Sequence, residues 1–196
     1  MARLFELRIE DIFEPDAISC FSSYTMDNPA HNPLNDLTFR RAGLPDLEAY
    51  LPLRMAMLAE LGMLPPEPQC TQLWNANRLY FQESLLKETY IAWLAENQDK
   101  IIATGGLLLF YRPPNGDNLT GLEGYVMNMY TLPVWRGRGI ANQLMQIIIE
   151  YMHTRQAGRL WLHATAIGRP IYESCGFTPV NQGLSSEANI EMELKL

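Results

Sequence analysis

Cysteine and positive charge are both scarce in this chain, and the two shortages exclude several classes of protein. Its 196 residues include three cysteines, Cys20, Cys70 and Cys175, at wide spacings. An odd number so spaced is typical neither of a disulfide framework nor of a metal cluster, so we expect no metal. The 15 lysines and arginines are outnumbered by 22 acidic residues, for a net charge of −7. That balance argues against nucleic acid or an anionic membrane as the main partner.

Long hydrophobic runs are missing as well. The longest apolar stretches fall well short of the ~20 residues that a membrane-spanning helix needs. The N-terminal residues, MARLFELRIEDIFEPD, mix acids and arginines without the apolar core of a signal peptide. We therefore expect a cytoplasmic protein that does not act at a membrane.

The chain has room for one compact domain with an extension. Residues 1–36 contain the polar stretch SSYTMDNPAHNPLND, in which turn-forming residues recur throughout. We interpret residues 1–36 as an N-terminal extension and residues 37–196 as the folded domain.

Hydrophobic periodicity predicts an α+β (mixed α/β) domain. Strands are expected at 37–41, 90–95, 101–111, 122–132, 159–164, 177–180 and 190–196, and helices at 47–61, 71–87, 140–152 and 169–174. Strands in tandem around single helical crossovers indicate a mixed sheet of about six or seven strands, with helices on both faces.

The most informative stretch is residues 132–151, LPVWRGRGIANQLMQIIIEY. A strand ends at Pro133, a turn with two arginines and two glycines follows, and an amphipathic helix starts at Ile140. Its expected buried face is made of apolar residues at helical spacing: Ile140, Ala141, Leu144, Met145, Ile147, Ile148, Tyr151 and Met152. Free N–H groups and the helix dipole at such a turn make a site for a phosphate or pyrophosphate.

Three phosphate-binding patterns compete for this turn. A P-loop needs Lys-Ser/Thr after its last glycine, but Ile140 and Ala141 follow Gly139, so this pattern is excluded. A dinucleotide fingerprint starting at Gly137 fails at its third glycine, where Asn142 stands. The third pattern, Arg-x-x-Gly-x-Ala, is matched by Arg136, Gly139 and Ala141.

This third pattern resembles the pyrophosphate-binding signature of the GCN5-related N-acetyltransferase (GNAT) superfamily. A second landmark of that family, apolar-Tyr-Glu-x-x-Gly-Phe, is similar to PIYESCGF at residues 170–177. The resemblance covers about residues 37–196 and implies the GNAT fold, a central twisted mixed sheet. LRMAMLAELG, YVMNMYTLP and LHATAIGRPIYESCGF together resemble a subgroup of small GNAT proteins whose acceptors are generally unassigned.

The resemblance implies acetyl-CoA as cosubstrate and assigns roles to particular residues. Backbone N–H groups would hold the pyrophosphate at Arg136, Gly137, Arg138, Gly139, Ile140 and Ala141. The strand residues Met129, Tyr130 and Thr131 would pair with the pantetheine arm, and Tyr172 would act as general acid near the CoA sulfur. Thr165 stands where the family often has an asparagine that contacts the cofactor.

An acceptor amine must lose a proton before it attacks the thioester, because an alkylamine with a pKa of about 10.4 is protonated at neutral pH. Glu123, at the start of the cofactor strand, is our candidate to relay that proton. Simple alternation puts Glu123 on one face of the strand with Tyr125, Met127 and Met129, and Asn128 on the opposite face.

Candidate acceptor contacts are Arg54, Glu60 and Asn128. Arg54 and Glu60 interrupt an otherwise apolar helix, and Asn128 interrupts an apolar strand. The structural alternatives are a solvated helix face or helix pair for the first two, and a hydrogen bond within the fold for Asn128. We interpret His163 as a hydrogen-bonded histidine rather than a base, and Cys175 as unreactive, since nothing adjacent would lower its pKa.

Two functions share this pattern, and a third uses the turn differently. The first is an acetyltransferase that acts by direct transfer to a small amine, an amino acid or a peptide N-terminus. The second is a CoA-binding sensor or interaction module without chemistry, and the third is a protein that binds another nucleotide. A homodimer is also expected to be possible, because the extension and the final strand both offer edges for pairing.

Overall fold

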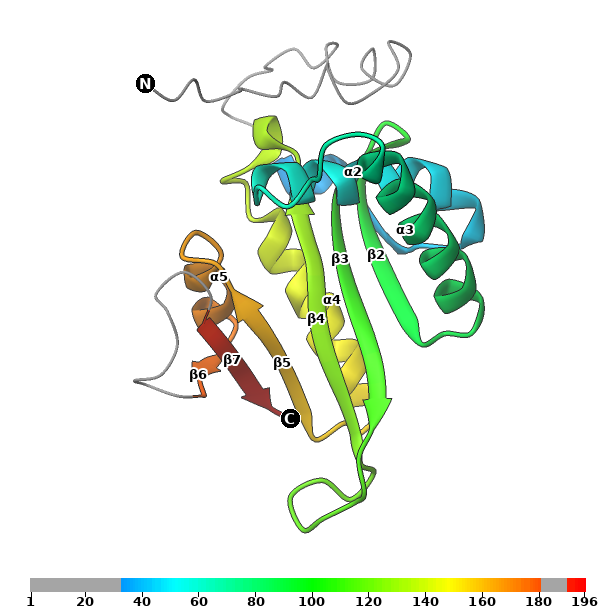
Figure 1. Ribbon diagram of the computed structural model, residues 1–196. Coiled ribbons are helices and arrows are strands. Elements are labelled where there is room, and N and C mark those ends of the chain that lie inside the picture. The colour runs from blue at the N-terminus through cyan, green and yellow to red at the C-terminus, as the bar shows by residue number, and fades with distance from the viewer. Residues whose placement is uncertain (1–32, 181–189) are drawn as a thin grey trace, which may run out of the picture. The chain divides into compact units, whose positions relative to one another are not determined.

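The computed structural model describes residues 33–180 and 190–196 (Figure 1). The proposed extension, residues 1–36, lies outside the described residues except for a single 3-10 turn, η2 (Pro33–Asp36). The division of the chain at residue 36 therefore stays a prediction.

The predicted order of strands and helices is confirmed. The strands are β1 (Thr38–Arg41), β2 (Tyr90–Asn97), β3 (Lys100–Tyr111), β4 (Leu122–Thr131), β5 (Arg159–Ala164), β6 (Thr178–Pro179) and β7 (Ile190–Lys195). The helices are α2 (Leu47–Glu60), α3 (Gln69–Leu86), α4 (Ile140–Thr154) and α5 (Arg169–Ser174), with 3-10 turns η3 (Leu44–Asp46) and η4 (Pro133–Trp135).

All seven strands form one mixed sheet in the order β1-β2-β3-β4-β5-β7-β6. The pairs from β1 to β4 are antiparallel, as are β5–β7 and β7–β6. Only β4 and β5 run parallel, because the crossover through α4 returns the chain to the same end of the sheet. The predicted α+β fold with a mixed sheet is confirmed.

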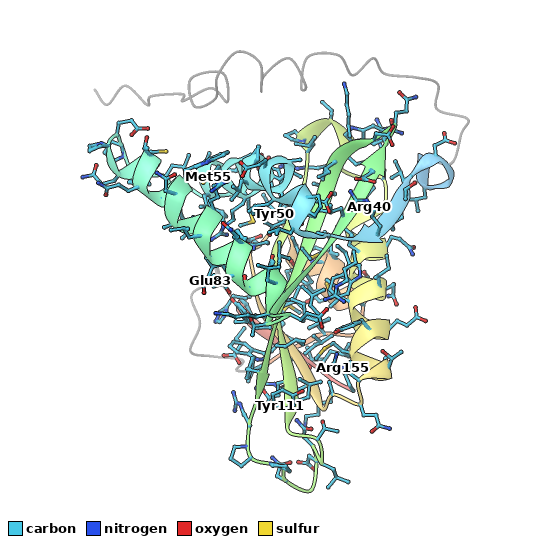
Figure 2. All side chains as sticks on the ribbon, turned by 90° about the vertical axis from the view of Figure 1, so that its right-hand side faces the viewer. Arg40, Tyr50, Met55, Glu83, Tyr111 and Arg155 are labelled. Atoms are coloured by element: carbon cyan, nitrogen blue, oxygen red, sulfur yellow. The ribbon has the colours of Figure 1, made fainter. Side chains whose placement is uncertain are left out.

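Two adjacent glycines of β3 show that helices cover both faces. A Cβ on Gly105 would meet Met129 and Ile148 of α4, whereas a Cβ on Gly106 would meet the hydroxyl of Tyr90. That hydroxyl is 2.6 Å from the hydroxyl of Tyr50 on α2. Figure 2 accordingly has α2 and α3 on one side of the strands and α4 on the other.

The predicted apolar faces of α2 and α4 differ from the observed ones in detail. In α4 the buried residues include Ile149, which was not in the predicted set, while Ala141, Ile147 and Tyr151 are only half-buried. In α2, Met55 is buried and Met57 is only half-buried, and Leu61 beyond the helix is exposed. The apolar spacing of the sequence predicts a different set: Leu47, Tyr50, Leu51, Leu53, Met57, Leu58 and Leu61. In both helices the buried residues recur at the predicted helical spacing, but the centre of the buried stripe is displaced around the helix from the predicted one.

The final strand is not an edge of the sheet, contrary to the premise of the dimer prediction. β7 pairs with β5 on one side and with β6 on the other, so β1 and β6 are the edge strands. β6 pairs with Met192 and Glu193 of β7 on the side where a second subunit was expected to pair. A dimer itself stays a prediction.

Within the described ranges, Cys70 and Cys175 are unpaired, and no three His, Cys, Asp or Glu side chains converge as metal ligands. None of the helices described is long and apolar enough to cross a membrane.

We predict that Gly106→Ala destabilises the fold by about 1–3 kcal/mol, as overpacking of a core does. The new Cβ would overlap the Tyr90 hydroxyl, which is buried and held by Tyr50 and Asn128. Urea unfolding measures the change. Gly116→Ala, in a loop where a Cβ meets nothing within 4 Å, is the control and should unfold as the wild type does; equal midpoints for the two variants would contradict the prediction.

Candidate functional site

The site begins where β4 and β5 part. The two strands pair only from Glu123–Arg159 to Tyr125–Trp161, and they diverge toward the end of the sheet where α4 begins (Figure 1). Residues 126–131 of β4 therefore have no strand partner on that side among the described residues. This free edge, about 17 Å long at the usual rise of a strand, includes the predicted cofactor residues Met129, Tyr130 and Thr131.

A β-bulge lies in the middle of the free edge. Asn128 and Met129 of β4 together oppose the single residue Gly105 of β3, and Asn128 has a left-handed φ of 54°. Such a bulge leaves an extra residue unpaired and turns the strand.

The bulge overturns the predicted alternation of β4. A buried cluster that includes Tyr50 lies beneath α2 and α3. Met127 packs against this cluster and the Asn128 side chain bonds to Tyr50, so these two neighbouring residues share a face. Met129 instead contacts the α4 side, beside Gly105 and Ile148. The prediction that Asn128 lies opposite Met127 and that Met129 lies with Met127 is therefore wrong, because the inserted residue reverses the alternation from Asn128 onward.

Asn128 is the centre of a buried polar network. Its Nδ2 donates to the hydroxyls of Tyr50 (3.0 Å) and Tyr90 (2.7 Å), and its Oδ1 accepts from Nη1 of Arg54 (2.7 Å). Burial raises the pKa of Tyr50 to about 12, and that of Tyr90 well above its usual value. Both tyrosines therefore stay neutral, and the Asn128 amide contacts protein groups rather than solvent.

The glycine turn ends in a helix start without a side-chain cap. Gly137 and Gly139 have φ of 74° and 79°, which favour glycine. Gly139 is the N-cap of α4 and offers no side chain to the first N–H groups, so those of Ile140 and Ala141 lack the usual cap. Arg138 lies over the Trp135 ring at 4.7 Å, at the same end of the helix.

Arg136 connects this turn to α2. Its Nη2 donates to both carboxylate oxygens of Glu60 (2.8 and 2.7 Å), and its Nε donates to the carbonyl of Thr131 (2.9 Å). Glu60 also accepts from Tyr130 (2.7 Å), and this bond together with burial raises the pKa of that tyrosine. The backbone N–H of Arg136 already donates to Pro133. Arg136 and Glu60 thus hold the turn in position, and of the N–H groups predicted to hold the pyrophosphate, that of Arg136 is already bonded within the fold.

Tyr172 lies on α5, whose start is organised by Thr165. The Thr165 hydroxyl accepts from the N–H of Gly168 (3.1 Å), and its carbonyl accepts from Arg169 (2.9 Å). The Tyr172 ring packs edge-on against Phe177, and burial raises the pKa of its hydroxyl to about 12. That hydroxyl has no hydrogen-bond partner in the described part of the chain.

Tyr125 brings a residue into the site that the sequence analysis set aside. Its hydroxyl is 3.1 Å from Nδ1 of His163, and the two rings pack edge to face with Trp161 alongside. His163 is exposed, and it follows the last β4–β5 pair by two residues. Tyr125 and His163 therefore meet where the strands begin to part. Only the contact between β4 and β5 identifies this pair, because the two residues are far apart in the sequence.

Glu123 is not brought together with these residues. It lies where β4 still pairs with both neighbours, and its carboxylate is 3.3 Å from Arg112 and 3.9 Å from Arg159. Accepting a proton would give up both attractions. The arrangement makes Glu123 a link between β3, β4 and β5 rather than a group aimed at the free edge.

A cavity of about 310 Å³ lies at the other end of α4, between the loop at 117–120 and residues such as His153 and Gly158. None of the predicted site residues lines it. Four of them, Asn128, Met129, Tyr130 and Thr131, lie instead on the free edge of β4.

Comparison with known proteins agrees with this geometry. Residues 56–177 match the sequence profile of the acetyltransferase (GNAT) family. YjgM of Escherichia coli K12, an uncharacterized N-acetyltransferase, is 25% identical over 163 residues, which are 80% of this chain and 91% of YjgM.

Two solved structures of similar sequence share the fold. A predicted acetyltransferase from Clostridium acetobutylicum, determined with acetyl-CoA, is 29% identical with a TM-score of 0.68, over 76% of this chain and 95% of its own. A GCN5-related N-acetyltransferase from Ralstonia eutropha JMP134 is 26% identical with a TM-score of 0.66, over 76% of this chain and 97% of its own. With a family match that spans most of its folded residues, this chain belongs to the acetyltransferase (GNAT) family.

Proposed function

We propose that the protein transfers an acetyl group from acetyl-CoA directly to an amine while both substrates are bound. The observation that carries the proposal is the free edge of β4, which leads into the uncapped N-terminus of α4. The acetyl-CoA present with the 29% identical Clostridium protein supports the choice of cosubstrate.

The chemistry of acetyl-CoA fits both parts of this surface. Pyrophosphate oxygens suit the N–H groups of residues 137–141 and the positive end of the helix dipole, and Arg138 adds a positive charge. The pantetheine arm contains amides, which can pair with the free edge as an added strand would. Thr165 accepts one hydrogen bond and keeps its own O–H to donate.

The amine proton goes to His163 in this proposal. His163 is exposed, is bonded to Tyr125, and lies at the start of the gap between the strands, and imidazole is the side chain suited to proton transfer near neutral pH. The imidazole first takes the proton of the ammonium and passes it to solvent, which leaves the free amine to attack the thioester. As the C–N bond forms and the C–S bond breaks, the second proton on nitrogen passes to the imidazole. Glu123, the candidate from the sequence, would have to act through water and against its two ion pairs.

Tyr172 acts on the sulfur. Its pKa of about 12 keeps the phenol protonated, so it can donate a hydrogen bond to the sulfur as negative charge develops there. A thiol has a pKa of about 8.5, so complete transfer from this phenol is uphill. The hydroxyl therefore stabilises the leaving thiolate by a hydrogen bond, and the thiolate takes its proton from solvent.

We predict that acetyl-CoA at 100 times its Kd stabilises the protein by about 2.7 kcal/mol, measured as a thermal shift. Arg138→Glu should weaken acetyl-CoA binding, because it puts a negative charge beside the pyrophosphate. Arg155→Glu, the same charge change at the other end of α4 (Figure 2), is the matched control and should bind normally. No shift with either acetyl-CoA or CoA would rule out the cosubstrate.

Tyr172→Phe should lower kcat by about 100-fold, as loss of one donor to a developing anion does, and should leave the Kd of acetyl-CoA nearly unchanged. Because the pKa of Tyr172 is about 12, the wild-type rate should show no loss of this donor as pH rises to 10. Tyr151→Phe is the control, since that hydroxyl bonds Arg155 on α4. A wild-type rate for Tyr172→Phe would remove the residue from the mechanism.

His163→Gln should lower kcat/KM at pH 7 by about 100-fold, in the usual range for loss of a general base. Glu123→Gln should instead leave kcat/KM nearly unchanged and lower the melting temperature, because Arg112 and Arg159 lose the carboxylate between them. The reverse pattern would return the proton-accepting role to Glu123. Binding of acetyl-CoA without transfer to any amine would favour the CoA-binding module.

A further inference from the structure

Arg54 is a half-buried cation whose partners are neutral. Its Nη1 donates to the amide oxygen of Asn128 (2.7 Å) and its Nε to the amide oxygen of Asn77 (3.3 Å). Within the described ranges it forms no ion pair with a carboxylate, and its Nη2 makes no hydrogen bond. A guanidinium has five N–H donors in a planar fork, so this side chain retains the donors that a second planar group would need.

The neighbouring carboxylates are engaged elsewhere. On α2, Glu48 pairs with Arg78 at 2.7 Å and Glu60 with Arg136 at 2.7 Å. On α3, Glu83 pairs with Lys87 at 3.0 Å. Each acid close in sequence or on the facing helix thus has its own cation, and Arg54 is left without one. Because burying part of a charge is unfavourable unless an opposite charge compensates it, the missing anion calls for an explanation.

The residue that holds Arg54, Asn128, has an uncommon backbone conformation. Asn128 has its left-handed φ of 54° at the bulge, an uncommon conformation for a residue other than glycine. Two buried tyrosine hydroxyls accept from its Nδ2, which directs its Oδ1 toward Arg54. The guanidinium is therefore fixed in place rather than left to extend into solvent.

The position of Arg54 relates it to the reaction. Asn128 lies within residues 126–131, the edge along which the pantetheine arm runs in the proposed function, and its side chain points to the α2 face. Arg54 is thus on the side of the sheet opposite α4, next to the part of β4 where the thioester would approach. An anion at Arg54 would belong to the acceptor rather than to the CoA pyrophosphate at the start of α4.

We infer that the acceptor is a free amino acid whose carboxylate binds the fork of Arg54 while its amine receives the acetyl group. The inference rests on the proposed function, since it identifies the second substrate of that same site. A carboxylate matches a planar guanidinium with two parallel hydrogen bonds. A simple amine would leave Arg54 without its anion. A peptide N-terminus has an amide in the place of that carboxylate and would also leave the charge without a partner.

The test compares amino acids with their decarboxylated amines: phenylalanine with phenethylamine, histidine with histamine, and lysine with cadaverine, within a panel of the standard amino acids. Free CoA release gives kcat/KM for each. At least one amino acid should exceed its matched amine by about 100-fold, the range expected of a charge-assisted contact. The inference is overturned if no amino acid is preferred over its amine.

Variants of Arg54 separate a carboxylate contact from a general loss of structure. Arg54→Gln should raise KM for the preferred amino acid about 100-fold and abolish the preference over the amine, with the Kd of acetyl-CoA unchanged. Arg54→Lys keeps the charge without the fork and should recover part of the preference. Arg78→Gln, on the outer surface of α3, is the matched control. A preference that survives in Arg54→Gln contradicts the assignment.

A binding measurement distinguishes failure of this inference from failure of the proposed function. Calorimetric titration of the same amino acids into the CoA-loaded protein needs no transfer. Binding that Arg54→Gln abolishes, with no acetylation of any acceptor, would uphold the carboxylate site and overturn the transferase proposal. Acetylation of amines alone would do the reverse, and absence of both binding and transfer would overturn the inference.

Discussion

The bulge at Asn128 is the constraint on which the site depends. One extra residue in β4 turns two consecutive side chains, Met127 and Asn128, toward α2 and sends Met129 to the α4 side. The side-chain amide of Asn128 stabilises this left-handed backbone, because it makes hydrogen bonds with two tyrosine hydroxyls and one guanidinium. β4 is thereby deformed in the stretch where β5 no longer pairs with it. The edge of β4 at residues 126–131 therefore has no strand partner on that side among the described residues.

Charge pairing connects the parts of the molecule that a substrate would touch. Glu60 at the end of α2 holds Arg136 at the start of the glycine turn, so the proposed acceptor and pyrophosphate sites are joined by an ion pair. Glu123 plays a similar part at the closed end of the gap, between Arg112 and Arg159. Arg54 differs from these arginines, because it is half-buried and its partners within the described residues are amides.

Much of the fold could be predicted because helices and strands have their own periods. The order of the elements, the strand-turn-helix at residues 132–151 and the short helix at Tyr172 follow from spacing and from glycine and proline positions. The errors have a common origin. The face of Met129 was mispredicted because a bulge has no signature in the period of β4. β7 was taken for an edge because the period of a strand does not give its neighbours, and the strand predicted at 177–180 pairs with it as β6.

The sequence by itself determined the chemistry available: a glycine turn before an amphipathic helix, a tyrosine on a later helix, and too little positive charge for a polyanion partner. These are local properties, carried by residues within one or two turns of each other. Tertiary structure decided which side chains are free to act. Glu60 and Arg136 are 76 residues apart and form an ion pair, and Tyr125 and His163 meet from parallel strands. Among the residues that the structure describes, Arg54 bonds two amides and no carboxylate. Pairing of this kind depends on distances between elements, which no local pattern encodes.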